Sequence, residues 1–99
     1  MQFSLESTQE YDKWFAKLKD PLTKNRILAR LSRVEKGNFG DFKALESNLF
    51  ELRFFFGPGW CIYYTIKSNC IVLLLVGGEK SSQDKDIAKA SELWAKLEE

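Results

Sequence analysis

The 99-residue sequence contains no histidine and only two cysteines, Cys61 and Cys70. This composition excludes catalysis by a serine–histidine or cysteine–histidine pair, and it provides too few ligands for a structural zinc site. Any proton transfer would therefore use a lysine, a tyrosine, a carboxylate, a group of the substrate or water. Because both cysteines lie in apolar stretches, we expect two small, buried or half-buried thiols. We expect neither a metal ion nor a cofactor.

The basic side chains are concentrated in the first half of the chain. Between Lys13 and Lys43 lie nine lysines or arginines and only three acidic residues, whereas the end of the chain is more acidic and the net charge is +1. A basic surface of this kind attracts phosphates or an acidic protein, and a solvated helix face is the alternative. Three of these residues recur at the spacing of one helix face: Arg26, Arg30 and Arg33.

The length is that of one small domain, and we expect residues 1–99 to fold around a single core. The longest apolar run, Cys70 to Val76, is much shorter than the roughly 20 residues that a membrane-spanning helix needs. No secretory signal is visible, so the composition predicts a cytoplasmic protein without a membrane partner.

The elements that must position any site follow from periodicity. Apolar spacing and capping residues predict helices over about 8–19, 21–36 and 82–97. Alternating or continuous apolar residues predict strands over 1–6, 49–56, 60–66 and 70–76, of which the last three form a meander that Gly77-Gly78 ends. The order β-α-α-β-β-β-α predicts an α+β fold, with two N-terminal helices and one C-terminal helix around a mainly antiparallel four-stranded sheet.

Several short motifs lie at the junctions of these elements: Gly37-Asn38-Phe39-Gly40-Asp41-Phe42-Lys43, Glu51-Leu52-Arg53, Gly57-Pro58-Gly59, Tyr63-Tyr64, and the run from Gly77 to Ile87. Their combination resembles the RelE/ParE superfamily of bacterial toxins from toxin–antitoxin pairs. Within that superfamily, the sequence is most similar to the HigB-type addiction module killer branch. The resemblance extends from Phe3 to Trp94, and the run that begins at Gly77 is its most specific part.

This resemblance implies a RelE-like fold and cleavage of mRNA in the ribosomal decoding site. The reaction would use the 2′-hydroxyl of the RNA and no metal. The partners implied are the ribosome, mRNA and a cognate helix-turn-helix antitoxin, with operator DNA bound only indirectly through that antitoxin. Two other functions stay open: a non-nucleolytic toxin of the gyrase-inhibiting type, and a degenerate toxin that retains only antitoxin binding.

The resemblance also assigns roles to individual residues. Arg53 and Lys80 are expected to be catalytic, through contacts to the phosphate or the leaving group. The residues expected to bind RNA are Lys43, Tyr63, Gln83, Arg26, Arg30 and Arg33. A structural role is the alternative for each of them, and for Tyr63 the two roles are packing in the core and a platform on which a base stacks.

One position departs from the branch. The Gly-Pro-Gly turn is usually followed by an aromatic residue and an arginine, but here Trp60 and Cys61 follow it. A cysteine supplies neither the charge nor the forked donors of an arginine. Alternation places Cys61 on the same sheet face as Arg53 and Tyr63, with Lys80 at one end and Lys43 nearby. Either Arg53 takes over the missing role, or the protein cleaves RNA poorly, or its target differs.

Overall fold

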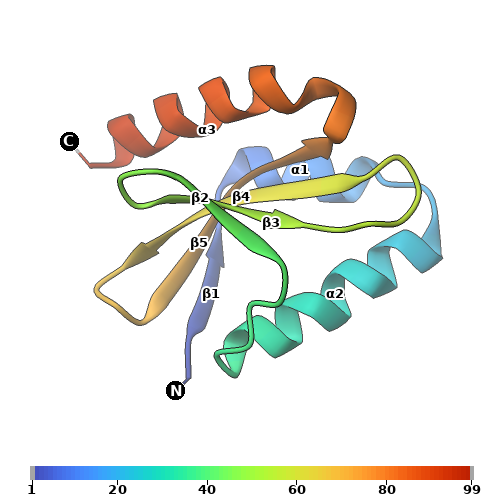
Figure 1. Cartoon of the computed structure of the whole chain (residues 1–99), viewed down its shortest axis with the longest axis horizontal. Coiled ribbons are helices and arrows are strands. Elements are labelled where there is room, and N and C mark those ends of the chain that lie inside the picture. The colour runs from blue at the N-terminus through green and yellow to red at the C-terminus, as the bar shows by residue number, and fades with distance from the viewer. Residues whose placement is uncertain (1, 99) are drawn as a thin grey trace.

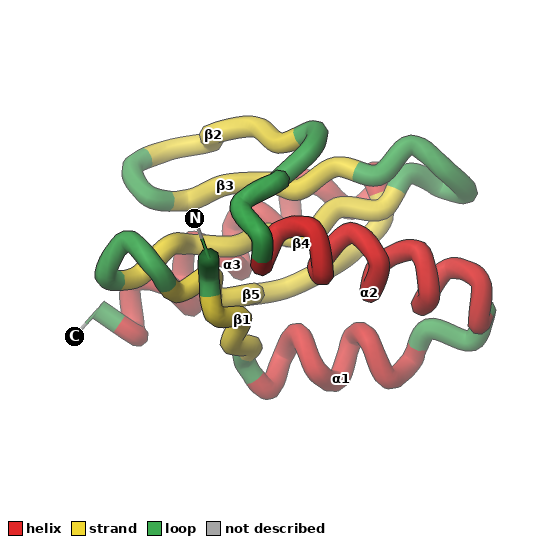
Figure 2. The backbone as a smooth tube through the Cα atoms, turned by 90° about the horizontal axis from the view of Figure 1, so that it is seen from below, coloured by secondary structure: helices red, strands yellow, loops and turns green. Residues whose placement is uncertain are grey.

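The computed structural model describes residues 2–98. Along the chain it contains β1 (Ser4–Ser7), α1 (Gln9–Lys17), α2 (Pro21–Glu35), β2 (Phe42–Glu46), β3 (Leu49–Arg53), β4 (Trp60–Lys67), β5 (Ile71–Glu79), the short 3-10 helix η1 (Lys80–Ser82) and α3 (Gln83–Leu97). A short turn joins α1 to α2, and both helices pack on one face of the sheet (Figure 2). The other face is covered by α3 (Figure 1). The predicted α+β class is therefore confirmed.

The sheet has five strands in the order β1-β5-β4-β3-β2, so the predicted count of four is wrong. The additional strand, β2, pairs antiparallel with β3. Its sequence does not alternate between apolar and polar residues, because it is an exposed edge strand with an irregular register between Ala44 and Glu46. The first strand pairs parallel with β5, while the other three pairings are antiparallel. The sheet is thus mainly antiparallel, as predicted.

The predicted start of the second helix is confirmed at Asp20. Its carboxylate accepts hydrogen bonds from the backbone N–H of Leu22 at 3.2 Å and from the hydroxyl of Thr23 at 2.8 Å, and Pro21 occupies the first helical position. Within residues 2–98, no helix has the length and apolarity that a membrane span requires.

The glycine pair at the end of the meander does not end the strand, contrary to the sequence-based expectation. Gly77 and Gly78 lie within β5 and pair with Ile62 and Cys61 of β4. A Cβ atom on Gly77 would overlap the Trp14 ring, and one on Gly78 would overlap the Asp86 carboxylate. The two glycines therefore allow α1 and α3 to approach opposite faces of β5 closely.

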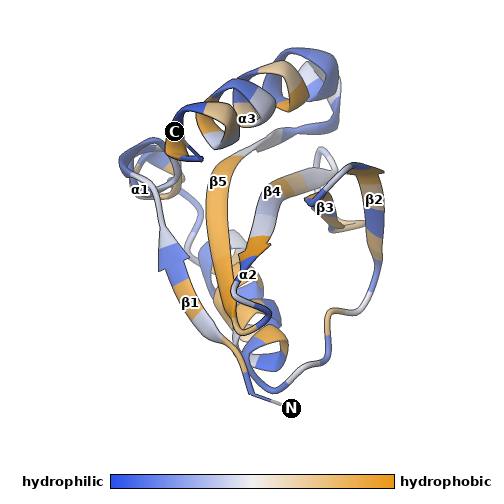
Figure 3. Cartoon of the chain, turned by 90° about the vertical axis from the view of Figure 1, so that its left-hand side faces the viewer, coloured by the Kyte–Doolittle hydropathy of each residue, from blue (hydrophilic) through white to orange (hydrophobic). Residues whose placement is uncertain are grey.

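The two faces of the sheet bury separate apolar clusters. Figure 3 shows β5 as a nearly continuous apolar strand between the helices. The cluster under α1 and α2 includes Ile27, Val34, Leu52, Ile62 and Tyr64. The smaller cluster under α3 includes Leu49, Cys61, Tyr63, Leu75 and Ala90. The face that carries Arg53 and Cys61 is thus only partly open, because α3 covers much of it.

Candidate functional site

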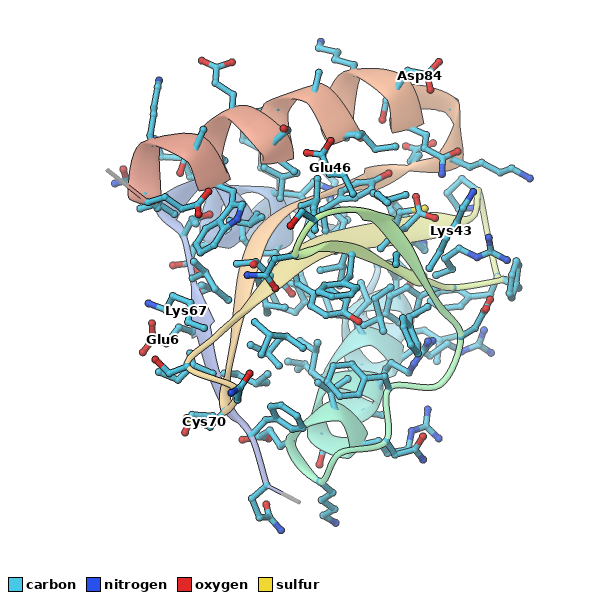
Figure 4. The ribbon with its side chains drawn as sticks, turned by 60° about the vertical axis from the view of Figure 1, so that its left-hand side comes forward. Glu6, Lys43, Glu46, Lys67, Cys70 and Asp84 are labelled. Carbon is cyan, nitrogen blue, oxygen red and sulfur yellow. The ribbon has the colours of Figure 1, made fainter. Side chains whose placement is uncertain are left out.

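A cavity of about 230 Å³ lies where the β3–β4 hairpin meets the start of α3. Its lining includes five residues that the sequence singles out, each from a different element: Lys43, Arg53, Cys61, Lys80 and Gln83. Figure 4 shows Lys43 at the same end of the molecule as Asp84 in the first turn of α3, with Cys70 at the opposite end. The fold therefore gathers three cations around one cavity, and we call this group of five residues the cationic pocket.

Arg53 is the last residue of β3 and lies opposite Cys61 in the register with β4. Its Nε atom is 3.4 Å from a carboxylate oxygen of Asp41, and its guanidinium carbon is 5.4 Å from the centre of the Phe55 ring. The side chain is 38% exposed, so it is held from one side and open to a ligand on the other. The sequence motif does not reveal Asp41 as its partner, because the two residues meet only when the loop before β2 folds back.

Lys80 is held at the pocket by its backbone. It follows β5 directly, and its N–H donates to the carbonyl of Gly59 in the β3–β4 turn at 2.7 Å. Gly59 has a φ of 80°, which residues with a Cβ rarely adopt, and a Cβ there would lie 3.3 Å from the Cβ of Lys80. The turn glycine thus fixes the approach of Lys80, while Lys43 reaches the pocket from the exposed edge strand β2.

Cys61 is buried at the base of the pocket and is 5% exposed. Burial, together with the nearby Glu51 carboxylate, raises the pKa of this thiol. The group is therefore a neutral thiol at neutral pH and adds no charge to the site. Cys70 is exposed, so the expectation of two buried or half-buried thiols is wrong for that residue.

Glu51 is a buried carboxylate that the sequence does not mark as part of the site. Its side chain is fully buried, and one carboxylate oxygen accepts a hydrogen bond from the amide nitrogen of Gln83 at 2.5 Å. The other oxygen has no partner within residues 2–98. Alternation with Arg53 places Glu51 on the pocket face, but only the position of α3 reveals that it is covered. No group of three or more potential metal-ligating side chains occurs in the described part of the chain.

Tyr63 does not provide a base-stacking platform, contrary to the prediction. The residue has no exposed surface and packs beneath α3, beside Cys61 and Ala90. Its hydroxyl oxygen is buried without a hydrogen-bond partner within residues 2–98. Desolvation raises the pKa of this hydroxyl far above its usual range, so the group stays protonated. Tyr63 is part of the core, which was the alternative role.

Arg30 binds the backbone of its own chain, so it has a structural role, and its contact with RNA stays a prediction. Its guanidinium donates to the carbonyl oxygens of Phe39 at 3.0 Å, Asp41 at 2.7 Å and Arg53 at 2.9 Å. It also lies over the Phe54 ring, 4.9 Å from the ring centre. Arg30 therefore fastens the loop before β2 to the end of β3.

Arg26 and Arg33 are exposed on α2 and do not line the cationic pocket. The guanidinium of Arg26 lies over the Phe56 ring at 4.7 Å from its centre. Both arginines, together with Arg30, border a shallow depression of about 240 Å³ beside Phe55, which is 78% exposed. The three arginines thus border one depression, as their helical spacing suggests, and contact of this group with RNA stays a prediction.

Comparison with known sequences identifies a relative of this chain. None of the protein-family models matches it. An uncharacterized protein of Haemophilus influenzae (strain Rd) is 41% identical to it over 97 residues, which cover 98% of each chain. The chain belongs to the family of this Haemophilus protein. The match extends over nearly the whole chain.

Solved structures with a similar fold include a bacterial toxin and a toxin–antitoxin complex. A variant of the Escherichia coli toxin RelE superposes with a TM-score of 0.75 at 14% identity, covering 93% of this chain and 97% of RelE. The RelBE2 toxin–antitoxin complex of Mycobacterium tuberculosis gives 0.65 at 15% identity, covering 81% of this chain and 100% of the matched one. A conserved hypothetical protein of Helicobacter pylori gives 0.57 at 23% identity, with coverage of 82% and 97%. The chain therefore has the fold of the RelE-type toxins.

Proposed function

We propose that the chain is the toxin of a type II toxin–antitoxin pair and that it cleaves mRNA in the decoding site of the ribosome. The observation that carries this proposal is the cationic pocket, in which Lys43, Arg53 and Lys80 converge from three separate elements. Such a site suits a phosphodiester, because oriented lysine and arginine donors stabilise charge on a phosphate. The RelE-type fold supports the same function.

Cleavage by the RNA's own 2′-hydroxyl makes few demands on the protein. The 2′-hydroxyl gives its proton to water as its oxygen attacks the phosphorus, the bond to the 5′-oxygen breaks, and that oxygen takes up a proton from water. The products are a 2′,3′-cyclic phosphate and a 5′-hydroxyl end. Arg53 and Lys80 would stabilise charge on the phosphate and on the departing oxygen, while Lys43 would hold the RNA backbone. The loss of one oriented donor typically lowers a rate by about 10²–10³-fold.

The proposed partners follow from the same function. A cognate antitoxin with a helix-turn-helix domain would neutralise the toxin in the cytoplasm, and operator DNA would be bound only through that antitoxin. The matched RelBE2 structure is a toxin–antitoxin complex, which supports a partner of this kind. Assignment to the HigB-type branch is part of this proposal and rests on the sequence motifs.

One observation favours a second candidate function. Cys61 lies directly opposite Arg53 in the sheet, at the position where the branch usually has an arginine, and it is a neutral thiol. A pocket with one cation fewer could still bind a phosphate without cleaving RNA. A toxin of the gyrase-inhibiting type, or a degenerate toxin that only binds its antitoxin, would have this property.

Mapping the 5′ ends of cellular mRNA after tightly controlled expression distinguishes these candidates. We expect new ends within translated messages for the wild type and for Lys89→Gln, a control that removes an exposed lysine of α3 outside the pocket. We expect no new ends for Arg53→Gln or Lys80→Gln. DNA-damage signalling without new ends would favour the gyrase-inhibiting type, and unaffected growth would favour the degenerate toxin.

A further inference from the structure

The buried contact between Glu51 and Gln83 fixes the orientation of one pocket side chain. Glu51 lies on β3, between Lys43 on β2 and Tyr63 on β4, and has no exposed surface. A carboxylate only accepts hydrogen bonds. The amide nitrogen of Gln83 therefore faces Glu51, as the hydrogen bond between them requires. The carbonyl oxygen of Gln83 is then the end of the amide that is directed away from Glu51 and is available to the pocket.

This carbonyl oxygen differs in character from the other groups of the pocket. The three charged side chains of the lining, Lys43, Arg53 and Lys80, can only donate hydrogen bonds. A bare phosphate would be satisfied by donors alone. An acceptor that is held in place among them suits a ligand that carries a hydroxyl donor close to its phosphate. In a nucleic acid, the group that meets this description is the 2′-hydroxyl of a ribonucleotide.

We propose that Gln83 accepts a hydrogen bond from the 2′-hydroxyl of bound RNA and that Glu51 is the positioning residue that holds Gln83 in this orientation. The pair makes the site selective for RNA over DNA. This inference rests on the proposed function, because it places an RNA backbone in the cationic pocket. It assigns a purpose to a fully buried carboxylate that the cleavage chemistry itself does not use.

Binding of short oligonucleotides tests the proposal without requiring cleavage. We suggest fluorescence anisotropy with an eight-nucleotide oligouridylate and with the same oligomer in the 2′-deoxy and 2′-fluoro forms. The uracil bases are identical in all three, and the 2′-fluoro form keeps the ribose conformation but lacks the donor. We expect the wild type to bind the ribose form about tenfold more tightly than the other two, which is the effect of roughly one hydrogen bond.

The variants separate positioning from charge. Gln83→Leu removes the acceptor. In Glu51→Gln the side chain of residue 51 can both donate and accept, so it no longer fixes the orientation of the Gln83 amide. Both variants should reduce the tenfold preference for the ribose form to about twofold or less. Asp84→Asn is the matched control, since it removes an exposed carboxylate from the same first turn of α3. It should strengthen binding of all three oligomers equally and keep the preference. Because Gln83 is only partly buried, its variant tests the proposal even if Glu51→Gln does not fold.

Two results would overturn the inference, and they differ from failure of the proposed function. Equal binding of the ribose and 2′-fluoro forms by the wild type, or an unchanged preference in Gln83→Leu, would show that Gln83 does not read the hydroxyl. If neither RNA nor DNA bound, or if binding did not weaken with salt, the cationic pocket would not be a nucleic-acid site at all. In that case the proposed function itself would be wrong.

Discussion

Replacing Arg30 with alanine should destabilise the protein far more than replacing the neighbouring arginines of α2. Arg30 donates three hydrogen bonds to the backbone and lies over the Phe54 ring. A Cβ on Gly40 would lie only 2.8 Å from Arg30 Nε, so the loop before β2 is closely fitted around the guanidinium. Without this side chain, that loop and the end of β3 lose these three hydrogen bonds to the helix.

The expected magnitude follows from these contacts. Hydrogen bonds from a charged donor contribute about 1.5–3 kcal/mol each, and the three bonds of Arg30 are only partly buried and share one side chain. We therefore expect a total loss below the sum of three such bonds, about 3 kcal/mol for Arg30→Ala. For a domain of this size, such a loss lowers the midpoint of thermal unfolding by roughly 12 °C or more. The free energy of unfolding of Arg30→Lys should lie between those of the wild type and Arg30→Ala, because an ammonium group cannot reach all three carbonyls.

Urea unfolding followed by tryptophan fluorescence measures these free energies. Arg33→Ala is the control, since Arg33 is exposed on the same helix and such surface substitutions usually change stability by less than about 0.5 kcal/mol. If Arg30→Ala and Arg33→Ala were equally stable, the structural role that we assign to Arg30 would be refuted.

Three further predictions concern the core and the thiols. Tyr63→Phe should leave RNA binding unchanged. It should also not lower the free energy of unfolding by more than about 0.5 kcal/mol, because it removes a buried hydroxyl without a partner. Loss of RNA binding would contradict the assignment of Tyr63 to the core. Gly78→Ala should destabilise the fold by about 1–3 kcal/mol through overlap with Asp86, and the double variant with Asp86→Ala should recover much of that loss in the same urea titration. Iodoacetamide at pH 8 should modify Cys70 much faster than Cys61, as followed by mass spectrometry, because Cys61 is buried and the pKa of its thiol is raised. Equal rates would contradict the burial of Cys61.

Alternation along the strands predicts correctly that Arg53 and Cys61 share one face of the sheet. The Gly-Pro-Gly turn fixes the hairpin, and the hairpin sets these two residues opposite each other. The same alternation also places Tyr63 and Glu51 on that face. It cannot indicate that α3 covers this part of the face, because covering depends on the packing of an element distant in sequence. The predicted cleft is therefore partly covered, and a cavity remains beside Arg53 and Cys61.

The remaining differences have a similar origin. Helical spacing groups Arg30 with Arg26 and Arg33, but it does not show which of them faces a loop that folds back onto the helix. The loop carbonyls that accept from Arg30 come from Phe39 and Asp41, and their positions are set by tertiary structure. Strand β2 is missed because an exposed edge strand has no core-facing pattern. Local patterns thus predict the elements and their faces better than the contacts between them.

The most direct test of the cationic pocket as an RNA-cleaving site is primer extension on a defined mRNA in a purified translation system. With ribosomes stalled on that message, the wild-type protein should produce a new 5′ end within the ribosome-bound codon. Arg53→Gln should lower the rate of this cleavage by about 10²-fold or more, while the control Lys89→Gln, at an exposed lysine of α3 outside the pocket, leaves it unchanged. If the wild type produced no cut, or if Arg53→Gln cleaved as fast as the wild type, the function proposed for this pocket would be contradicted.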